Sequence, residues 1–159
     1  MAEASEQAHN YKAHLTWDGN KGSGTSSYAA YGREYTITVG GKPTFAGSAD
    51  SAFRGNRELH NPEDLLVMSL SSCHMLSYLA LCALQGIRVI AYEDNASGTM
   101  MSNRNGGRFT EVILRPHVTI AAGCDITLAT KLHETAHEQC FIASSCNFPV
   151  LHQPTIGQE

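Results

Sequence analysis

The chain has 159 residues, of which 42% are hydrophobic and 16% are charged, a composition typical of one globular domain with its own core. A net charge of −4 and an isoelectric point near 6.0 argue against nucleic acid or an anionic membrane as the main partner. We expect a flexible polar tail over residues 1–10 and a single domain over residues 11–159.

Cysteine usage is the next constraint. No basic, apolar leader begins the sequence, which predicts a cytoplasmic protein. In a reducing compartment an odd number of cysteines indicates thiol chemistry or plain packing rather than a disulfide scaffold. The five are Cys73, Cys82, Cys124, Cys140 and Cys146.

The N-terminal part of the chain is expected to form strands. Alternation of apolar and polar residues predicts strands over His14–Trp17, 25–31 and 34–39, and the Gly-Gly pair after the third makes a turn. Residues 42–60 are rich in turn chemistry and are predicted to be loop.

A long central helix follows. Asn61 is a good N-cap, Pro62 suits the first helical position, and Gly86 can close the helix in the left-handed conformation. Residues 65–84 carry no formal charge, so the helix is predicted to be buried on nearly all sides. That length would also suit a membrane span, but the stretch contains several serines, begins with acidic residues and has no flanking basic cluster. We therefore predict a core helix.

Further strands are expected over 88–92, 96–101 and 108–120, with a turn at 103–107. Pro116 inside the last of them implies an edge or a bulge. The side chains expected to share one face of that strand are Val112, Leu114, Val118 and Ile120.

A second helix is predicted from Asp125 or Thr127 to about 144, followed by a closing extended segment over 148–156. This order of strands, buried helix, strands and amphipathic helix predicts an α+β fold with antiparallel sheets. The inner stripe of the second helix consists of Leu128, Leu132, Ala136 and Cys140.

Cys73, in the middle of the central helix, is the first candidate for chemistry. A cysteine in a buried helix is most often a small apolar side chain. Its neighbours at helical spacing mix small and apolar residues, which leaves room for a molecule to approach the sulfur. Cys82 lies nine residues on and points to the opposite face, so packing explains it better.

A second thiol could face Cys73. Cys140 lies on the inner stripe of the second helix, so the two sulfurs could meet across the core. Cys146 and Cys124 are competitors, and spacing does not decide among the three. A reactive thiol also needs a nearby cation, and Arg33 and Arg54 are the candidates.

His133 and His137 form a literal HExxH, which on a helix can hold zinc in a metalloprotease. The metzincin continuation is absent, because Cys140 and Ala143 stand where it requires Gly and His. The two histidines also lie off the apolar stripe, toward the polar side. A zinc hydrolase is therefore a remote alternative.

Several pieces together resemble one family. They are HLTWDG, YGREY, GSADSAFRGN, NPEDLLVMSLSSCHML, AYEDNASGTM and AHEQCFIASSCNFPV. The combination of NPE, Cys73 ten residues after Glu63 and a distant second cysteine resembles the OsmC/Ohr family of osmotically inducible and organic hydroperoxide resistance proteins, in a divergent OsmC-like branch.

The resemblance implies an intertwined homodimer and a thiol peroxidase that reduces organic hydroperoxides or hydrogen peroxide. It assigns Cys73 as the peroxidatic thiol and Cys140 as the resolving thiol, with Glu63 orienting the guanidinium of Arg33 or Arg54. It also implies an external dithiol reductant such as a lipoyl group, and no metal or flavin. The alternative is a non-enzymatic stress or ligand-binding protein on the same fold.

Helix geometry adds a constraint on Glu63. Ten helical residues place it about 15 Å from Cys73, so the two cannot meet directly on a straight helix. Either the helix is broken near its start, or the carboxylate reaches a thiol by folding back or from the other subunit.

Overall fold

The structure is a computed structural model that describes residues 6–159. By their contacts these residues form two compact units, one ending at Asp64 and one running from Leu65 to Glu159. Of the expected tail, residues 1–5 lie outside the described part, and residues 6–10 have no regular secondary structure.

The first unit contains a small antiparallel sheet. Its strands are β1 (His14–Trp17), β2 (Tyr35–Thr38) and β3 (Phe45–Gly47), in that order, followed by one turn of 3-10 helix at Ser51–Phe53. The predictions for β1 and β2 are therefore confirmed.

Two predictions for this unit need correction. Residues 25–31 form turns rather than a strand, because the Asn20 side chain accepts the N–H groups of Gly22 and Gly24 and both glycines have positive φ. The expected loop over 42–60 contains β3, whose pairing with β2 outweighs its local turn signals.

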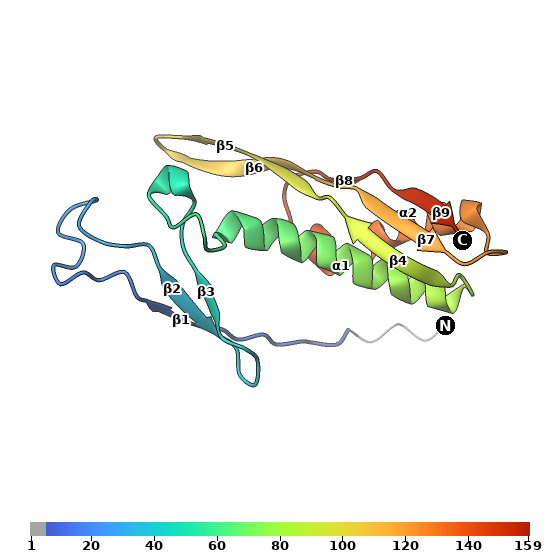
Figure 1. Cartoon of the computed structure of the whole chain (residues 1–159), viewed down its shortest axis with the longest axis horizontal. Coiled ribbons are helices and arrows are strands. Elements are labelled where there is room, and N and C mark those ends of the chain that lie inside the picture. Colours follow the sequence, from blue (N-terminus) through green and yellow to red (C-terminus); the bar gives the residue numbers. More distant parts are fainter. Residues whose placement is uncertain (1–5) are drawn as a thin grey trace. The chain divides into compact units, whose positions relative to one another are not determined.

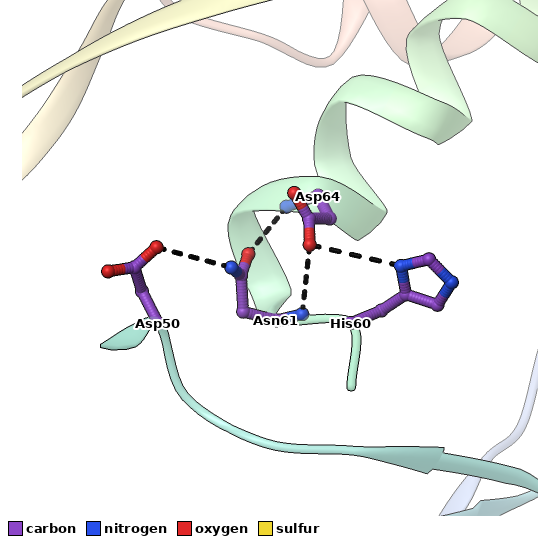
Figure 2. Close-up of polar contacts among 4 residues, drawn as sticks. All are labelled: Asp50, His60, Asn61 and Asp64. Carbon is purple, nitrogen blue, oxygen red and sulfur yellow. Dashed lines mark hydrogen bonds and ion pairs between the residues drawn. The ribbon is translucent and has the colours of Figure 1, made fainter. Parts of the chain in front are cut away.

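The central helix is α1 (Pro62–Leu84), and its ends are those that the sequence predicts. Figure 2 shows the N-terminal cap: the Asn61 Oδ1 accepts the Asp64 N–H at 2.8 Å, and the Asp64 carboxylate accepts the Asn61 N–H at 3.3 Å. The Asp50 carboxylate accepts a hydrogen bond from the side-chain amide of Asn61, and the His60 Nδ1 lies 3.8 Å from the Asp64 carboxylate. One small polar network therefore fixes the start of the helix. At the other end, Gly86 has φ +73°.

Replacing Asn61 by alanine is expected to lower the free energy of unfolding by about 1 kcal/mol, because the Asp64 N–H loses its acceptor. Urea denaturation followed by circular dichroism measures this. Asn10→Ala, at an exposed position without regular structure, is the matched control and should change nothing. An Asn61→Ala midpoint equal to that of the wild type would contradict the assigned cap.

The second unit holds two mixed three-stranded sheets. One has the order β4 (Val89–Asp94), β7 (Pro116–Ile120), β9 (Thr155–Gln158); the other has the order β5 (Ser97–Asn103), β6 (Gly106–Leu114), β8 (Val150–His152). Within each, the last strand is parallel to its neighbour. Figure 1 shows β5 and β6 as a long hairpin. The remaining elements are α2 (Ile126–Glu138) and α3 (Phe141–Ser144), and the α+β class is confirmed.

The core of this unit has two clusters. One joins the C-terminal half of α1 to β7 and α2 through side chains such as Tyr78, Ile120 and Ala129. The other joins Leu70 of α1 to β6 and β8. The four residues predicted to share a face of one strand are all buried, but they divide between the two clusters.

The expected strand 108–120 is in fact two strands in different sheets. The chain leaves β6 at Leu114 and enters β7 at Pro116, and the Arg115 N–H donates to the Asp94 carboxylate at 2.7 Å instead of to a strand. Pro116 begins β7, which is the central strand of its sheet, rather than lying at an edge or bulge. A proline is tolerated there because it occupies the first position of the strand.

The buried face of α1 is narrower than predicted. Its fully buried residues are a single stripe at four-residue spacing, namely Leu70, His74, Tyr78 and Cys82, whereas Met68, Leu76 and Leu84 are exposed. By length and composition α1 could cross a membrane, and no other helix of residues 6–159 could. Here its buried stripe packs against strands and α2.

Candidate active site

Cys73 lies half-buried on α1 and lines a groove of about 500 Å³. The Ser69 and Ser72 hydroxyls in this groove donate to carbonyls of the preceding helical turn, at 2.8 Å each, so they are already paired. The groove therefore presents mainly carbon around the sulfur. It is lined by Ser69, Ser72, Cys73, Leu76, Ser77, Phe141 and Ile142.

Cys140 is the thiol next to Cys73. It is 1% exposed, and burial together with the neighbouring Cys73 thiol raises its pKa to about 11, although the amides of Ala143 and Ile142 act in the opposite direction. Both cysteines are free in this structure. Of the two sulfurs, only that of Cys73 faces the groove, so a reagent entering there meets Cys73 first.

The position of Cys140 on its element differs from the prediction. The second helix ends at Glu138, and Cys140 is the extended residue (φ −74°, ψ 108°) between α2 and α3 rather than part of one continuous helix. No glycine or proline marks this break in the sequence.

The competing thiol, that of Cys146, is hydrogen-bonded to the backbone of its own segment. Its Sγ donates to the Ile142 carbonyl at 3.3 Å, and its side chain packs with the cluster around Leu70. Burial raises the pKa of Cys146. Of the three thiols that the sequence offers as partners, the structure therefore brings Cys140 to Cys73.

Arg33, in the first unit, is held by its own loop. Its guanidinium lies over the rings of Tyr28 and Tyr31, 4.4 and 4.1 Å from their centroids, and donates to both carbonyl oxygens, at 2.7 Å for Tyr28. Trp17 packs edge-on against Tyr31. The orientation of the Arg33 guanidinium is therefore fixed by contacts within its own loop.

Arg54 and Glu63 also belong to the first unit. Arg54 has φ 65° and closes the 3-10 helix, with its N–H donated to the Ser51 carbonyl. Glu63 lies in the first turn of α1, and its charge adds to burial in raising the pKa of Tyr35. Because α1 is unbroken from Pro62 to Leu84, the alternative of a helix broken near its start is wrong. Glu63 and Cys73 of one chain stay about 15 Å apart along the axis.

The sequence profile of the family described as OsmC-like protein matches residues 55–152, which include Glu63, Cys73 and Cys140. The chain belongs to the OsmC-like family. The resemblance drawn from the sequence is confirmed at this level. A search of curated proteins found no match.

Solved structures agree with the OsmC-like assignment. An OsmC-like protein of unknown function from Vibrio cholerae is 32% identical, with a TM-score of 0.83 over 93% of this chain and 100% of that one. An organic hydroperoxide resistance protein from Elizabethkingia anophelis has 18% identity and a TM-score of 0.70, over 98% and 100% of the two chains. The organic hydroperoxide resistance protein OhrB of Bacillus subtilis has 20% identity and a TM-score of 0.62, over 91% and 98%. The last two share the fold.

Beside the thiols, this OsmC-like chain buries a histidine cluster that the sequence did not predict. The His74 Nε2 lies 2.9 Å from the His133 Nδ1, His133 stacks on Tyr78 with centroids 3.8 Å apart, and the His152 ring is 5.6 Å from that of His74. Burial, with nearby histidines, lowers the pKa of His74 to about 4 and that of His133 to about 3. The signal that could have revealed His74 is its place in the Leu70–Tyr78 stripe.

This cluster corrects the placement of the HExxH. His133 is fully buried, not on the polar side of α2, and it pairs with His74 across the core. Within residues 6–159, no group of three or more His, Cys, Asp or Glu side chains is placed to hold a metal ion. The geometry therefore gives the zinc-hydrolase alternative no support.

Proposed function

We propose that this protein is a cysteine-based peroxidase that reduces organic hydroperoxides. The observation that supports this most is the pair of neighbouring free thiols, one opening to a groove and the other buried. A raised pKa keeps Cys140 protonated while Cys73 meets the substrate, so the two sulfurs have separate roles: Cys73 attacks and Cys140 resolves.

The reaction takes two steps. The Cys73 thiolate attacks the terminal peroxide oxygen, so an S–O bond forms, the O–O bond breaks, and the alkoxide takes a proton and leaves as the alcohol. Cys140 then loses its proton and attacks the Cys73 sulfur. The S–S bond forms, the S–O bond breaks, and hydroxide takes a proton and leaves as water. An external dithiol, with lipoyl as our candidate, reduces the disulfide by exchange and becomes a disulfide itself.

The lining of the groove favours an apolar substrate. Leu76, Phe141 and Ile142 supply hydrocarbon, and the hydroxyls of Ser69 and Ser72 are paired to backbone carbonyls. We therefore expect hydroperoxides with a hydrocarbon chain to react faster than hydrogen peroxide, because their chains gain about 25 cal/mol per Å² of apolar surface buried.

The cation for the Cys73 thiolate remains a proposal. Arg33 and Arg54 are the candidates, and Glu63 would orient the guanidinium by a charge-assisted hydrogen bond. Arg33 is favoured because its stacking between two tyrosine rings has already restricted its rotamers. The unbroken α1 means that a Glu63 acting at Cys73 would come from a second chain.

We further propose that the protein is a homodimer. Large apolar side chains stay exposed along α1, with Leu76 62% and Leu84 81% exposed, and single chains rarely leave such a surface uncovered. Sedimentation equilibrium at micromolar concentration should give twice the mass of one chain. Leu76→Glu should shift the equilibrium to the monomer, whereas Leu151→Glu, also exposed but on β8, should not. A monomeric wild type would contradict the proposal.

The decisive experiment measures the consumption of cumene hydroperoxide with dihydrolipoamide as the electron donor. Cys73→Ser should lose more than about 100-fold of the rate, because the nucleophile is gone. Cys146→Ser should keep the wild-type rate. If Cys73→Ser consumes peroxide as the wild type does, the peroxidase proposal fails and a non-enzymatic binding role on the same fold replaces it.

A further inference from the structure

A second pair of cysteines lies at the opposite end of α1 from Glu63, and the proposed mechanism does not use it. Cys82 is 1% exposed and lies in the last turn of the helix, and Cys124 is half-buried in the turn between β7 and α2. Both belong to the same apolar cluster, in which Cys124 packs against the buried side chains that include Cys82.

Backbone hydrogen bonds bring the two cysteines to one short connector, residues 87–88. The Cys82 carbonyl accepts the Ile87 N–H at 2.9 Å, and the next amide, that of Arg88, donates to the Cys124 Sγ at 3.5 Å. The Arg88 carbonyl in turn accepts the Ala121 N–H at 2.9 Å, at the start of the turn that carries Cys124. The end of α1 and this turn are therefore fastened to the same two residues.

The Cys124 thiol also acts on the Cys82 thiol electrostatically. Burial raises the pKa of Cys82, and Cys124 raises it further, whereas the phenol of Tyr78 acts in the opposite direction. Cys124 accepts an N–H bond at its sulfur and is partly exposed, so of the two it is the thiol that an oxidant would meet first.

We propose that Cys82 and Cys124 form a second redox pair, which an organic hydroperoxide converts to a disulfide that fastens the end of α1 to the β7–α2 turn. The Cys124 thiolate attacks the peroxide: an S–O bond forms, the O–O bond breaks, and the alkoxide takes a proton and leaves as the alcohol. Cys82 loses its proton and attacks the Cys124 sulfur, so the S–S bond forms, the S–O bond breaks, and hydroxide takes a proton and leaves as water.

This pair works independently of Cys73. Nine helical residues separate Cys82 from Cys73, which is about 13 Å of rise and about half a turn of rotation, so the folded chain cannot pass a disulfide between them. The proposal therefore does not rest on the peroxidase activity and can be tested without it.

The test uses Cys73→Ser protein, in which the tryptic peptide 58–88 contains Cys82 as its only cysteine, while peptide 109–131 contains only Cys124. The protein is treated with cumene hydroperoxide, denatured in N-ethylmaleimide, digested and analysed by mass spectrometry. We expect peptides 58–88 and 109–131 to be joined, and the join to disappear on treatment with dithiothreitol.

Two variants in the Cys73→Ser background are the controls. Cys124→Ser and Cys82→Ala should each abolish the joined peptides and leave Cys140 and Cys146 to be alkylated. The oxidised Cys73→Ser protein should also unfold about 10 °C higher than its reduced form, because the new bond closes a long loop. Recovery of both cysteines as alkylated thiols, oxidation of Cys124 alone, or a join of peptide 58–88 to peptide 132–159 would each overturn the proposal.

Discussion

Cys140→Ser is expected to consume one equivalent of cumene hydroperoxide at Cys73, at close to the wild-type rate, after which Cys73 reacts no further. The first step needs the Cys73 sulfur in its groove but no second thiol, whereas the second step needs the sulfur beside it. Without a resolving thiol, Cys73 stays a sulfenic acid, because the buried serine hydroxyl cannot replace a thiol as nucleophile. Sustained turnover with a dithiol should fall by more than about 100-fold.

Stopped-flow peroxide consumption separates the first equivalent from later turnover, and dimedone labelling followed by mass spectrometry places the sulfenic acid. Dimedone should label Cys73 in the Cys140→Ser protein and not in the wild type. Cys146→Ser is the matched control, because its sulfur bonds to the Ile142 carbonyl, and it should turn over normally. Full turnover by Cys140→Ser, lost only when Cys146 is also replaced, would assign resolution to Cys146.

Acidification is expected to destabilise the fold through the buried histidine pair. In the unfolded chain each histidine takes up a proton below pH 6.5, but in the folded chain His74 does so only near pH 4 and His133 near pH 3. The unfolded state therefore binds more protons as the pH falls below about 6.5, and the stability present above that pH is lost progressively toward pH 4 for His74 and toward pH 3 for His133. Between pH 7 and pH 5 the loss should be about 2 kcal/mol for each of the two.

His133→Phe isolates this effect. Phenylalanine can keep the stacking against Tyr78 but cannot titrate, so the loss of unfolding free energy between pH 7 and pH 5 should shrink by about 2 kcal/mol relative to the wild type. Urea denaturation at the two pH values gives this difference. His9→Gln, at an exposed position outside the strands and helices, should leave the pH dependence unchanged. An equal pH dependence in His133→Phe and wild type would show that His133 is not the responsible group.

Local signals were enough to predict α1. Asn61, Pro62 and Gly86 each act through their own backbone, so the caps of the helix could be read without knowledge of its neighbours. The same holds for Asp125, whose side chain accepts the Leu128 N–H at the start of α2. Residues that act on their own turn are visible in a sequence.

Features that depend on distant partners could not be read in this way. The break at Cys140 has no local marker, and the division of residues 108–120 into two strands depends on the carboxylate of Asp94, about twenty positions earlier. Helical spacing places His133 off the apolar stripe and toward the polar side of the helix, whereas in the structure Tyr78 and His74 pack against its ring. The sequence offers three thiols as partners for Cys73, and the choice of Cys140 over Cys146 as its neighbour needs coordinates.

Because α1 is continuous, two inactive variants of the proposed dimer are expected to complement each other. Glu63 and Cys73 belong to one continuous helix and lie about 15 Å apart along its axis. In our proposal each active site therefore combines the Glu63 carboxylate of one chain with the Cys73 sulfur of the other. A variant that lacks the Glu63 carboxylate and a variant that lacks the Cys73 thiol would then restore activity when they are mixed. Each mixed dimer would contain one active site with both groups.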